Sequence, residues 1–149
     1  MPKNLSDLLS FNEIKVSYTC KRIGASITSS RDAYDFMLPH WEDLDYCESF
    51  YVLLLSRGNN ILGASRISIG GVAGTVADPK KIFQTALAAN ASAIIIMHNH
   101  PSGMARPSNN DHVVTKKCVE VGKFLELPVL DHVIVCKNTY YSFADEGMI

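Results

Sequence analysis

The stretch "ASAIIIMHNHP", residues 91–101, decides the fold of this chain. Residues 91–97 are continuously apolar and rich in β-branched side chains, which predicts a strand covered on both faces. The strand should end at His98, so that His98 and His100 lie where a buried strand emerges into a loop. Loops at the ends of rigid strands are common positions for catalytic and binding residues.

Upstream of this run, the pattern predicts further strands and one short helix. "EIKVSYT" (13–19) has the period of a half-buried strand, and "SSRDAYDFMLPHW" (29–41) has serine caps followed by helical spacing. "ESFYVLLLS" (48–56) and "NILGASRISI" (60–69) are β-rich and flank the turn-like "RGNN", which predicts an antiparallel hairpin. The first hairpin strand is apolar on both faces, so we expect it to be central.

Two longer helices are predicted around the opening stretch. In "ADPKKIFQTALAANA" (77–91), Asp78 suits an N-cap and Pro79 the first helical position. The apolar stripe of this helix is Ile82, Phe83, Ala86 and Leu87, and that of the helix after residue 107 is Val114, Cys118, Val121 and Leu125.

The remaining apolar segments, "VLDHVIVCK" (129–137) and "TYYSF" (139–143), predict a strand and a final short segment. Strands and helices that alternate in this way predict an α/β (α+β) fold with helices packed on a mixed sheet. We expect a single three-layer domain over residues 1–149, with its core in about residues 13–149.

Composition narrows the class of protein. The chain has 149 residues, of which 47% are hydrophobic and 19% charged, as in an ordinary globular domain. A formal net charge of −1 lacks the basic excess that non-specific phosphate binding needs. No apolar run is long enough to span a membrane, and the polar N-terminus lacks a signal-peptide core, so we expect a cytoplasmic protein without a membrane partner.

The cysteines do not form a pattern that indicates a disulfide framework or a thiolate zinc site. They are widely spaced, without a C-x-x-C pair, at Cys20, Cys47, Cys118 and Cys136. This spacing favours small apolar residues in a reducing compartment.

The segment "HNHPSGMARPSNND", residues 98–111, could form a metal site. If strand geometry persists through Asn99, both imidazoles project from the same face of the strand. The prolines and glycine that follow can reverse the chain, and Asp111 falls in the first turn of the next helix. Two histidines and one carboxylate leave a fourth tetrahedral position for water, which is typical of catalytic rather than structural zinc sites.

The alternative is a helix cap beside two ordinary histidines. Ser108 followed by Asp111 also matches an N-cap with an acidic residue favoured by the helix dipole. The rarity of His-x-His with a serine and an aspartate at these offsets favours a metal site. The two interpretations are compatible, because a capped helix start is a rigid mount for Asp111.

Glu48 is the candidate base, because it is a carboxylate that opens a strongly apolar strand. Burial there would raise its pKa toward the working pH, so that it could take a proton from water and return it to a leaving group. Alternatively Glu48 precedes the buried part of the strand and points to solvent. This stretch alone leaves the two interpretations about even.

Together these residues resemble the JAMM motif of JAB/MPN metalloproteases. That motif has an upstream glutamate, then His-x-His-Pro and Ser-x-x-Asp, here Glu48, His98, His100, Ser108 and Asp111. Asn99 stands where the deubiquitinating branch usually has Ser or Thr, whereas "HNHPSG", the later "PS..D" and "LDHVIV" resemble the RadC-like branch. The resemblance runs from about Glu13 to the C-terminus.

The resemblance implies a JAB/MPN architecture, which is cytidine-deaminase-like, and one Zn²⁺ per chain. It implies that His98, His100 and Asp111 are the zinc ligands, that Glu48 is the general acid/base and that Ser108 helps to hold the oxyanion. The reaction implied is hydrolysis of a peptide or isopeptide bond in an unknown protein or peptide substrate. The RadC-like family is labelled DNA repair.

Full-length RadC-like proteins have an N-terminal helical region that resembles helix-hairpin-helix DNA-binding modules. Residues 1–45, which precede "YCESF", are too few for that module plus the first strand and helix. We therefore expect no direct DNA binding. Exposed sheet edges leave a homodimer as a possible assembly.

Two other functions are compared with hydrolysis. A zinc nucleobase deaminase needs H-x-E and P-C-x-x-C, and neither occurs here. A non-catalytic accessory or interaction module, associated with DNA repair or mobile elements, would use the metal structurally. The intact Glu48 argues against that alternative, because a structural metal site needs no base.

Five further residues are candidates for a place at the site. Asp131 and His132 are neighbours on a strand and face opposite ways, so a structural role is favoured, in which one of them could orient a ligand. His112 and His40 are expected to be surface or packing residues. Arg106 could contact an anionic substrate group, but a solvated loop charge is favoured.

Overall fold

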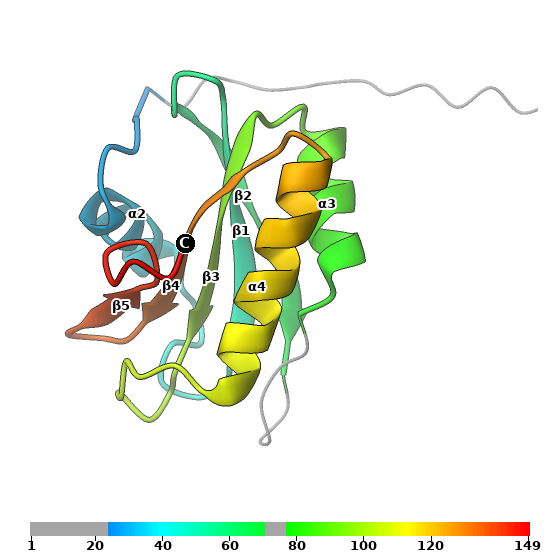
Figure 1. Ribbon diagram of the computed structural model, residues 1–149. Helices are drawn as coiled ribbons and strands as arrows, with labels where there is room; N and C mark the ends of the chain where they lie inside the picture. Colours follow the sequence, from blue (N-terminus) through cyan, green and yellow to red (C-terminus); the bar gives the residue numbers. More distant parts are fainter. Residues whose placement is uncertain (1–23, 71–76) are drawn as a thin grey trace, which may run out of the picture.

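The computed structural model describes residues 24–70 and 77–149, and in that part of the chain it shows a five-stranded sheet with helices on both faces (Figure 1). The strands are β1 (Ser49–Leu55), β2 (Ile61–Ile69), β3 (Ala93–Asn99), β4 (Val129–Val135) and β5 (Tyr140–Ser142). The helices are α2 (Ser30–Met37), the short 3-10 helix η1 (Leu38–His40), α3 (Pro79–Ala88) and α4 (Asn109–Phe124). The predicted α/β class with a mixed sheet is confirmed. The strand predicted over 13–19 lies outside the described residues.

The sheet has the order β2-β1-β3-β4-β5, with β3 at its centre. β1 pairs antiparallel with both β2 and β3, β3 pairs parallel with β4, and β4 pairs antiparallel with β5. The predicted hairpin and the central position of β1 are therefore confirmed. Every residue of β3 is buried, because helices cover both faces of the sheet at this strand.

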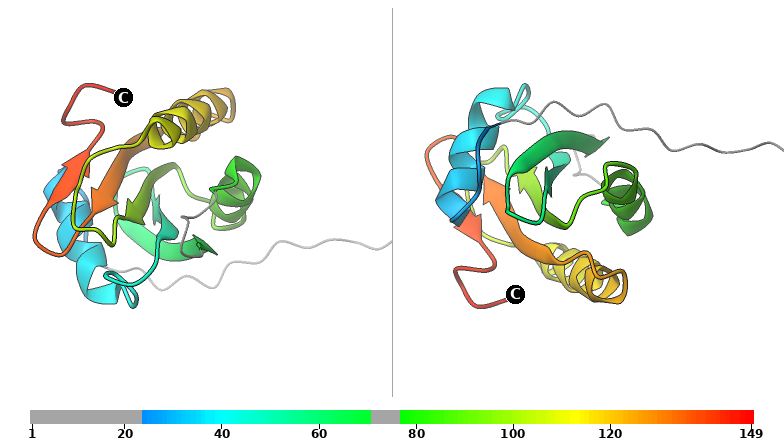
Figure 2. Two further views of the ribbon diagram at one scale, coloured as in Figure 1. Left: turned by 90° about the horizontal axis from the view of Figure 1, so that it is seen from below. Right: turned by 90° about the horizontal axis from the view of Figure 1, so that it is seen from above.

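Helices lie on both sides of the sheet (Figure 2), and the residues on its two faces form separate cores. On one face Met37 of α2 packs with Leu53 of β1 and Met97 of β3. On the other face Phe83 of α3 and Cys118 of α4 belong to a second cluster with strand residues. Alternate residues of β3 thus face α2 on one side and the α3 and α4 layer on the other.

The helix starts follow their sequence signals. Asp78 is the N-cap of α3 and accepts a hydrogen bond from the backbone N–H of Lys80, and Pro79 is the first helical residue. The predicted apolar stripes are correct except at Leu87 and Leu125, which are 53% and 37% exposed. Leu87 follows Ala86, the last buried residue of α3, and one residue turns the helix by about 100°, which takes its side chain off the buried face. Leu125 lies directly after the last turn of α4.

The described cysteines are free thiols, with Cys118 and Cys136 buried and Cys47 half-buried. Burial raises the pKa of the Cys118 thiol to about 11, so that it stays protonated and apolar in the core. Within residues 24–70 and 77–149, none of the helices has both the length and the apolar character needed to cross a membrane.

Gly122 lies where α4 passes close to the following turn, and we predict that Gly122→Ala destabilises the fold. A Cβ there would lie 2.6 Å from the carbonyl oxygen of Leu127. Alanine gains about 1 kcal/mol of helix propensity over glycine, but we expect this close contact to lower the free energy of unfolding by about 1–3 kcal/mol overall. Denaturant unfolding measures the change. Gly63→Ala is the control, because a Cβ there has no atom within 4 Å, and equal effects of the two changes would contradict the prediction.

Candidate metal centre

The candidate site lies at the end of the sheet where strand β3 finishes and where β1 and α4 begin (Figure 1). The antiparallel register pairs Phe50 of β1 with His98 of β3. Continued by two residues on each strand, the same register sets Glu48 opposite His100. Two segments about fifty residues apart in sequence therefore meet at this end of the sheet.

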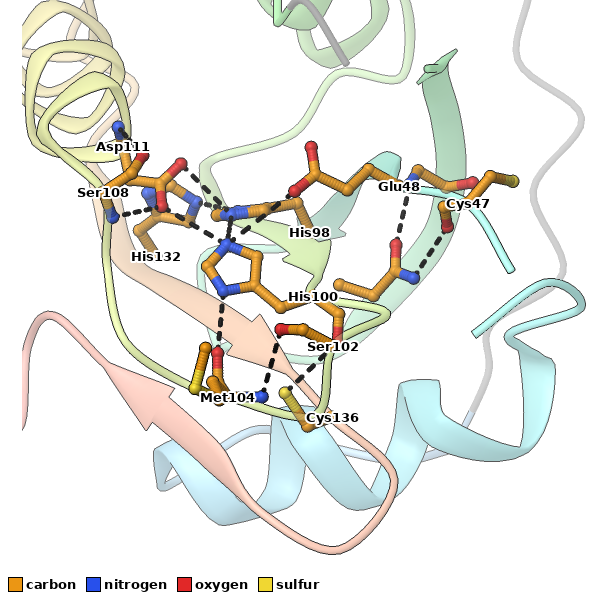
Figure 3. Close-up of polar contacts among 12 residues, drawn as sticks. Cys47, Glu48, His98, His100, Ser102, Met104, Ser108, Asp111, His132 and Cys136 are labelled. Carbon is orange, nitrogen blue, oxygen red and sulfur yellow. Dashed lines mark hydrogen bonds and ion pairs between the residues drawn. The ribbon is translucent and has the colours of Figure 1, made fainter. Parts of the chain in front are cut away.

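His98, His100 and Asp111 form a compact group that could hold a metal ion (Figure 3). One ligand atom from each side chain can be chosen so that all three lie within 4.8 Å of one another. The distance from His98 Nε2 to His100 Nε2 is 3.0 Å, and Asp111 Oδ1 and Oδ2 lie 3.2 Å from His98 Nε2 and 3.4 Å from His100 Nε2. The group is mostly shielded from solvent, since the side chains of His98, His100 and Asp111 are 3%, 13% and 14% exposed.

The His100 ring is oriented by the loop that follows it. Gly103 donates its backbone N–H to the carbonyl oxygen of His100 (3.0 Å) and has a φ of 81°, which glycine adopts without strain. This turn brings the carbonyl oxygen of Met104 to 2.9 Å from His100 Nδ1. A carbonyl can only accept, so His100 Nδ1 bears the proton, and in the neutral ring Nε2 presents a lone pair toward Asp111.

Asp111 is both part of this group and part of a helix cap. Its Oδ2 accepts the backbone N–H of Ser108 (2.8 Å), and the Ser108 hydroxyl accepts the backbone N–H of Asp111 (3.1 Å). This is a complete capping box at the start of α4. The cap that the sequence offered as an alternative to a metal site is therefore present in the same residues.

The electrostatics of the group favour a negative Asp111 and a positive His100. Burial acts to raise the pKa of the Asp111 carboxyl, but its contacts with His100 and His98 and the hydrogen bond from the Ser108 backbone N–H hold that pKa far below its usual range. The hydrogen bond to Asp111 raises the pKa of His100 above 6.5 against the effect of burial. The site thus attracts positive charge, whether a proton or a metal ion.

Glu48 lies at the rim of this group, immediately before β1. Its Oε1 is 4.0 Å from His100 Nε2, and its side chain is 27% exposed. Its backbone carbonyl accepts the N–H of Gly70 (2.8 Å), so the pairing of β1 with β2 continues to this residue. The carboxylate therefore faces the histidines rather than pointing only to solvent.

Ser108 is exposed, and its hydroxyl oxygen accepts the Asp111 backbone N–H. Because that bond uses a lone pair, the hydroxyl proton is left for another acceptor. Its role in holding an oxyanion stays a prediction.

Asp131 and His132 face opposite sides of β4, as expected for neighbours on a strand. Asp131 accepts the hydroxyl of Ser142 (2.6 Å) and the backbone N–H of Ala144 (3.0 Å), away from the site. His132 lies toward the site, with Nε2 2.8 Å from His98 Nδ1. Complete burial lowers the pKa of His132 well below 6.5, so its ring is neutral.

The other considered residues do not join the group. His40 and Arg106 are exposed. The His112 ring packs edge-on against Phe143, with 5.3 Å between the ring centroids.

Asn99 is a structural residue of the site whose role the sequence did not reveal. Asn99 stands between the two candidate ligand histidines in the sequence, and its fully buried side chain lies on the face of β3 opposite to His98. It accepts the backbone N–H of Ser49 (2.7 Å) and donates to the carbonyl oxygens of Leu44 and Cys47 (2.8 Å each). Asn99 therefore ties the strand of the histidines to the segment on both sides of Glu48. In the sequence, the only signal for this role is a polar residue directly after a long apolar run and one histidine.

This fold and site define the class of protein. A mixed sheet flanked by helices, with His-x-His at the end of a central strand and an aspartate in the first turn of the next helix, is the arrangement of a JAB domain. The family model described as RadC-like JAB domain matches residues 27–148, and the chain belongs to the RadC-like JAB domain family. The JAB domains as a group include some metalloproteases.

Several relatives are UPF0758 proteins. One from Flavobacterium johnsoniae is 42% identical over 122 residues, which cover 82% of this chain and 53% of that protein. One from Methanosarcina barkeri is 38% identical over 123 residues, covering 83% and 53%. One from Alkaliphilus metalliredigens is 35% identical over 137 residues, covering 91% and 58%. The chain thus spans little more than half the length of these curated relatives.

We predict that Asn99→Ala lowers the free energy of unfolding by about 3 kcal/mol, because it leaves an N–H and two carbonyl groups without their partner. Thermal or denaturant unfolding measures the loss. Asn110→Ala is the matched control, since Asn110 is exposed in the first turn of α4 and its removal should change stability by no more than about 0.5 kcal/mol. A loss in Asn99→Ala no larger than in the control would show that the buried amide does not hold the two segments together.

Proposed function

We propose that this protein is a zinc-dependent hydrolase of the JAMM type that cleaves a peptide or isopeptide bond. The observation that carries the proposal is the convergence of two imidazole nitrogens and a carboxylate on one point, with a second carboxylate, that of Glu48, at 4.0 Å from His100. Three ligands and a nearby base are the composition of a catalytic zinc site rather than a structural one.

The donor set fits zinc. Imidazole nitrogen and carboxylate oxygen are both ordinary zinc ligands. The facing nitrogen and oxygen atoms of His98, His100 and Asp111 lie 3.0 to 3.4 Å apart, and such atoms are stable this close together only when a proton or a metal ion lies between them. Three protein ligands would leave the fourth tetrahedral position of zinc open for water.

Each residue has a defined task in this proposal. When bound, zinc would supply Lewis-acid chemistry, which activates water near neutral pH and polarises a carbonyl. Glu48, at the rim, takes the proton of the attacking water and returns it to the leaving nitrogen. Ser108, whose hydroxyl proton is not used by the cap, donates a hydrogen bond to the developing oxyanion.

The substrate we propose is a protein or peptide, and the net charge of −1 supports action without direct DNA binding. We propose a cytoplasmic location and a single domain that could pair as a homodimer through a sheet edge. We propose that a link to the DNA-repair label of the family would come through processing of a repair protein.

The metal site is tested by zinc content. Protein that has been stripped and reloaded with zinc should retain about one ion per chain after gel filtration, as measured by mass spectrometry of the metal. His98→Ala combined with His100→Ala should abolish retention, whereas His40→Ala, which removes an exposed histidine, should not. Absence of zinc from the unaltered protein, or its retention in the double variant, would refute the metal site.

Hydrolysis is tested at Glu48. On a mixture of linear and isopeptide-linked peptides, we expect Glu48→Gln to reduce turnover by about 10²- to 10⁴-fold, because the amide cannot take a proton from water. The variant should still retain zinc. Glu42→Gln is the control, since that side chain is 78% exposed. If the zinc-loaded protein cleaves none of these substrates while it retains the ion, a non-catalytic role of the site is favoured.

A further inference from the structure

His132 is a buried histidine that lies behind the candidate ligands and that neither the motif nor the proposed reaction uses. It lies on β4, is 0% exposed and contacts His98 on one side, with 2.8 Å between His132 Nε2 and His98 Nδ1. On its other side, His132 Nδ1 is 2.6 Å from the hydroxyl oxygen of Thr115 in α4. That hydroxyl lies 2.7 Å from the backbone carbonyl oxygen of Asp111. A continuous line of polar contacts thus connects two of the candidate ligands.

The direction of every hydrogen bond in this line follows from its last member. The carbonyl oxygen of Asp111 can only accept, so the Thr115 hydroxyl donates its one proton to it. Thr115 must therefore accept from His132, which places the His132 proton on Nδ1. In the neutral ring Nε2 then has a lone pair, and it accepts the proton of His98 Nδ1.

The consequence falls on the other nitrogen of His98. A neutral imidazole has one proton, so with the proton on Nδ1 the Nε2 atom presents a lone pair toward Asp111, 3.2 Å away. The opposite tautomer would put an N–H at the point where the three side chains converge. It would leave two bare nitrogens facing each other between His98 and His132, which is unfavourable in a buried site.

We propose that His132, through Thr115, is a positioning residue that sets the tautomer and the ring orientation of His98, and so prepares Nε2 of His98 to ligate a metal ion. This inference rests on the metal site proposed above. It assigns to the histidine of "LDHVIV" a task that the motif residues do not perform.

The surroundings of His132 hold the ring in the required plane. Phe143 stacks on it with 4.8 Å between the ring centroids and 10° between the planes, and Phe50 packs at 5.8 Å from another side. These apolar rings exclude water from the line of contacts. A histidine suits this position because it accepts at one nitrogen and donates at the other.

The first test uses the metal-free protein and does not depend on zinc. Two-bond ¹H–¹⁵N correlation spectra at mildly alkaline pH distinguish the two tautomers of each histidine. We expect His98 and His132 both to bear their proton on Nδ1. A His98 ring with its proton on Nε2, or a mixture with that form in the majority, would overturn the inference.

The second test compares two amides at the same position. In His132→Gln the terminal amide approximates the place of Nε2 and can still accept from His98, whereas in His132→Asn the amide approximates the place of Nδ1 and reaches only toward Thr115. We expect zinc affinity, from titration against a chromophoric chelator, to fall about 10- to 100-fold in His132→Asn and much less in His132→Gln. Equal losses in the two variants, or none in either, would contradict the inference.

Thr115 provides a variant that leaves both histidines in place. Thr115→Val keeps the shape but removes the acceptor that holds the His132 proton on Nδ1, so the population of the Nδ1–H tautomer of His98 and the zinc affinity should both fall. Thr115→Ser keeps the hydroxyl and should restore both. This pair decides the question if the His132 variants do not fold, and an unchanged His98 tautomer in Thr115→Val would overturn the inference.

The results also separate this inference from the proposed function. If the unaltered protein binds no zinc, the proposed metal site fails, while the tautomers in the metal-free protein still test whether His132 orients His98. If the unaltered protein binds zinc and the variants of His132 and Thr115 bind it equally well, only the inference fails.

Discussion

The antiparallel register between β1 and β3 is the constraint on which the candidate site depends. It pairs Phe50 with His98 and thereby brings Glu48 to the position opposite His100. A slip of one residue would turn every side chain of β1 to the other face of the sheet. The apolar cores on both faces oppose such a slip, because Val52 and Leu53, which face opposite cores, are both fully buried. The position of the proposed base is thus fixed by the packing of residues that take no part in chemistry.

The two faces of β3 have different roles at the candidate site. On the face toward α4, His98 meets Asp111 and His132. On the other face, Asn99 accepts the N–H of Ser49 and donates to two carbonyls of the segment before it. One strand therefore presents a candidate ligand on one side and secures the segment containing Glu48 from the other. The asparagine between the histidines is explained by these three bonds, since a serine hydroxyl is too short and has too few donors to replace them.

The sequence predicted most of the fold because its strands and helices have strong local signals. The apolar run that became β3, the hairpin of β1 and β2 and the caps at Asp78 and Ser108 are all encoded within a few residues. Register, by contrast, depends on contacts between residues about fifty positions apart, so the distance between Glu48 and His100 could not be derived from spacing. The contacts of Asn99 escaped prediction because they reach backbone carbonyls, and those of Thr115 because they depend on how α4 lies against β4. Leu87 was misassigned because hydrophobicity alone does not show where the buried stripe of a helix ends.

Asp111 explains why the helix cap and the candidate metal site are one structure. Its carboxylate closes the capping box and faces both histidines, and its backbone carbonyl accepts the Thr115 hydroxyl at the end of the contacts that begin at His98. The start of α4 and the orientation of His98 are therefore set by the same residue. His100 is likewise held through its outer nitrogen by the Met104 carbonyl, so contacts with protein groups orient both imidazole rings. This arrangement concentrates negative potential where the three side chains meet. The pKa of His100 is raised mainly by its hydrogen bond to Asp111, because positive charge is stabilised at this point. A proton supplies that charge in the metal-free protein, and a divalent cation would supply more.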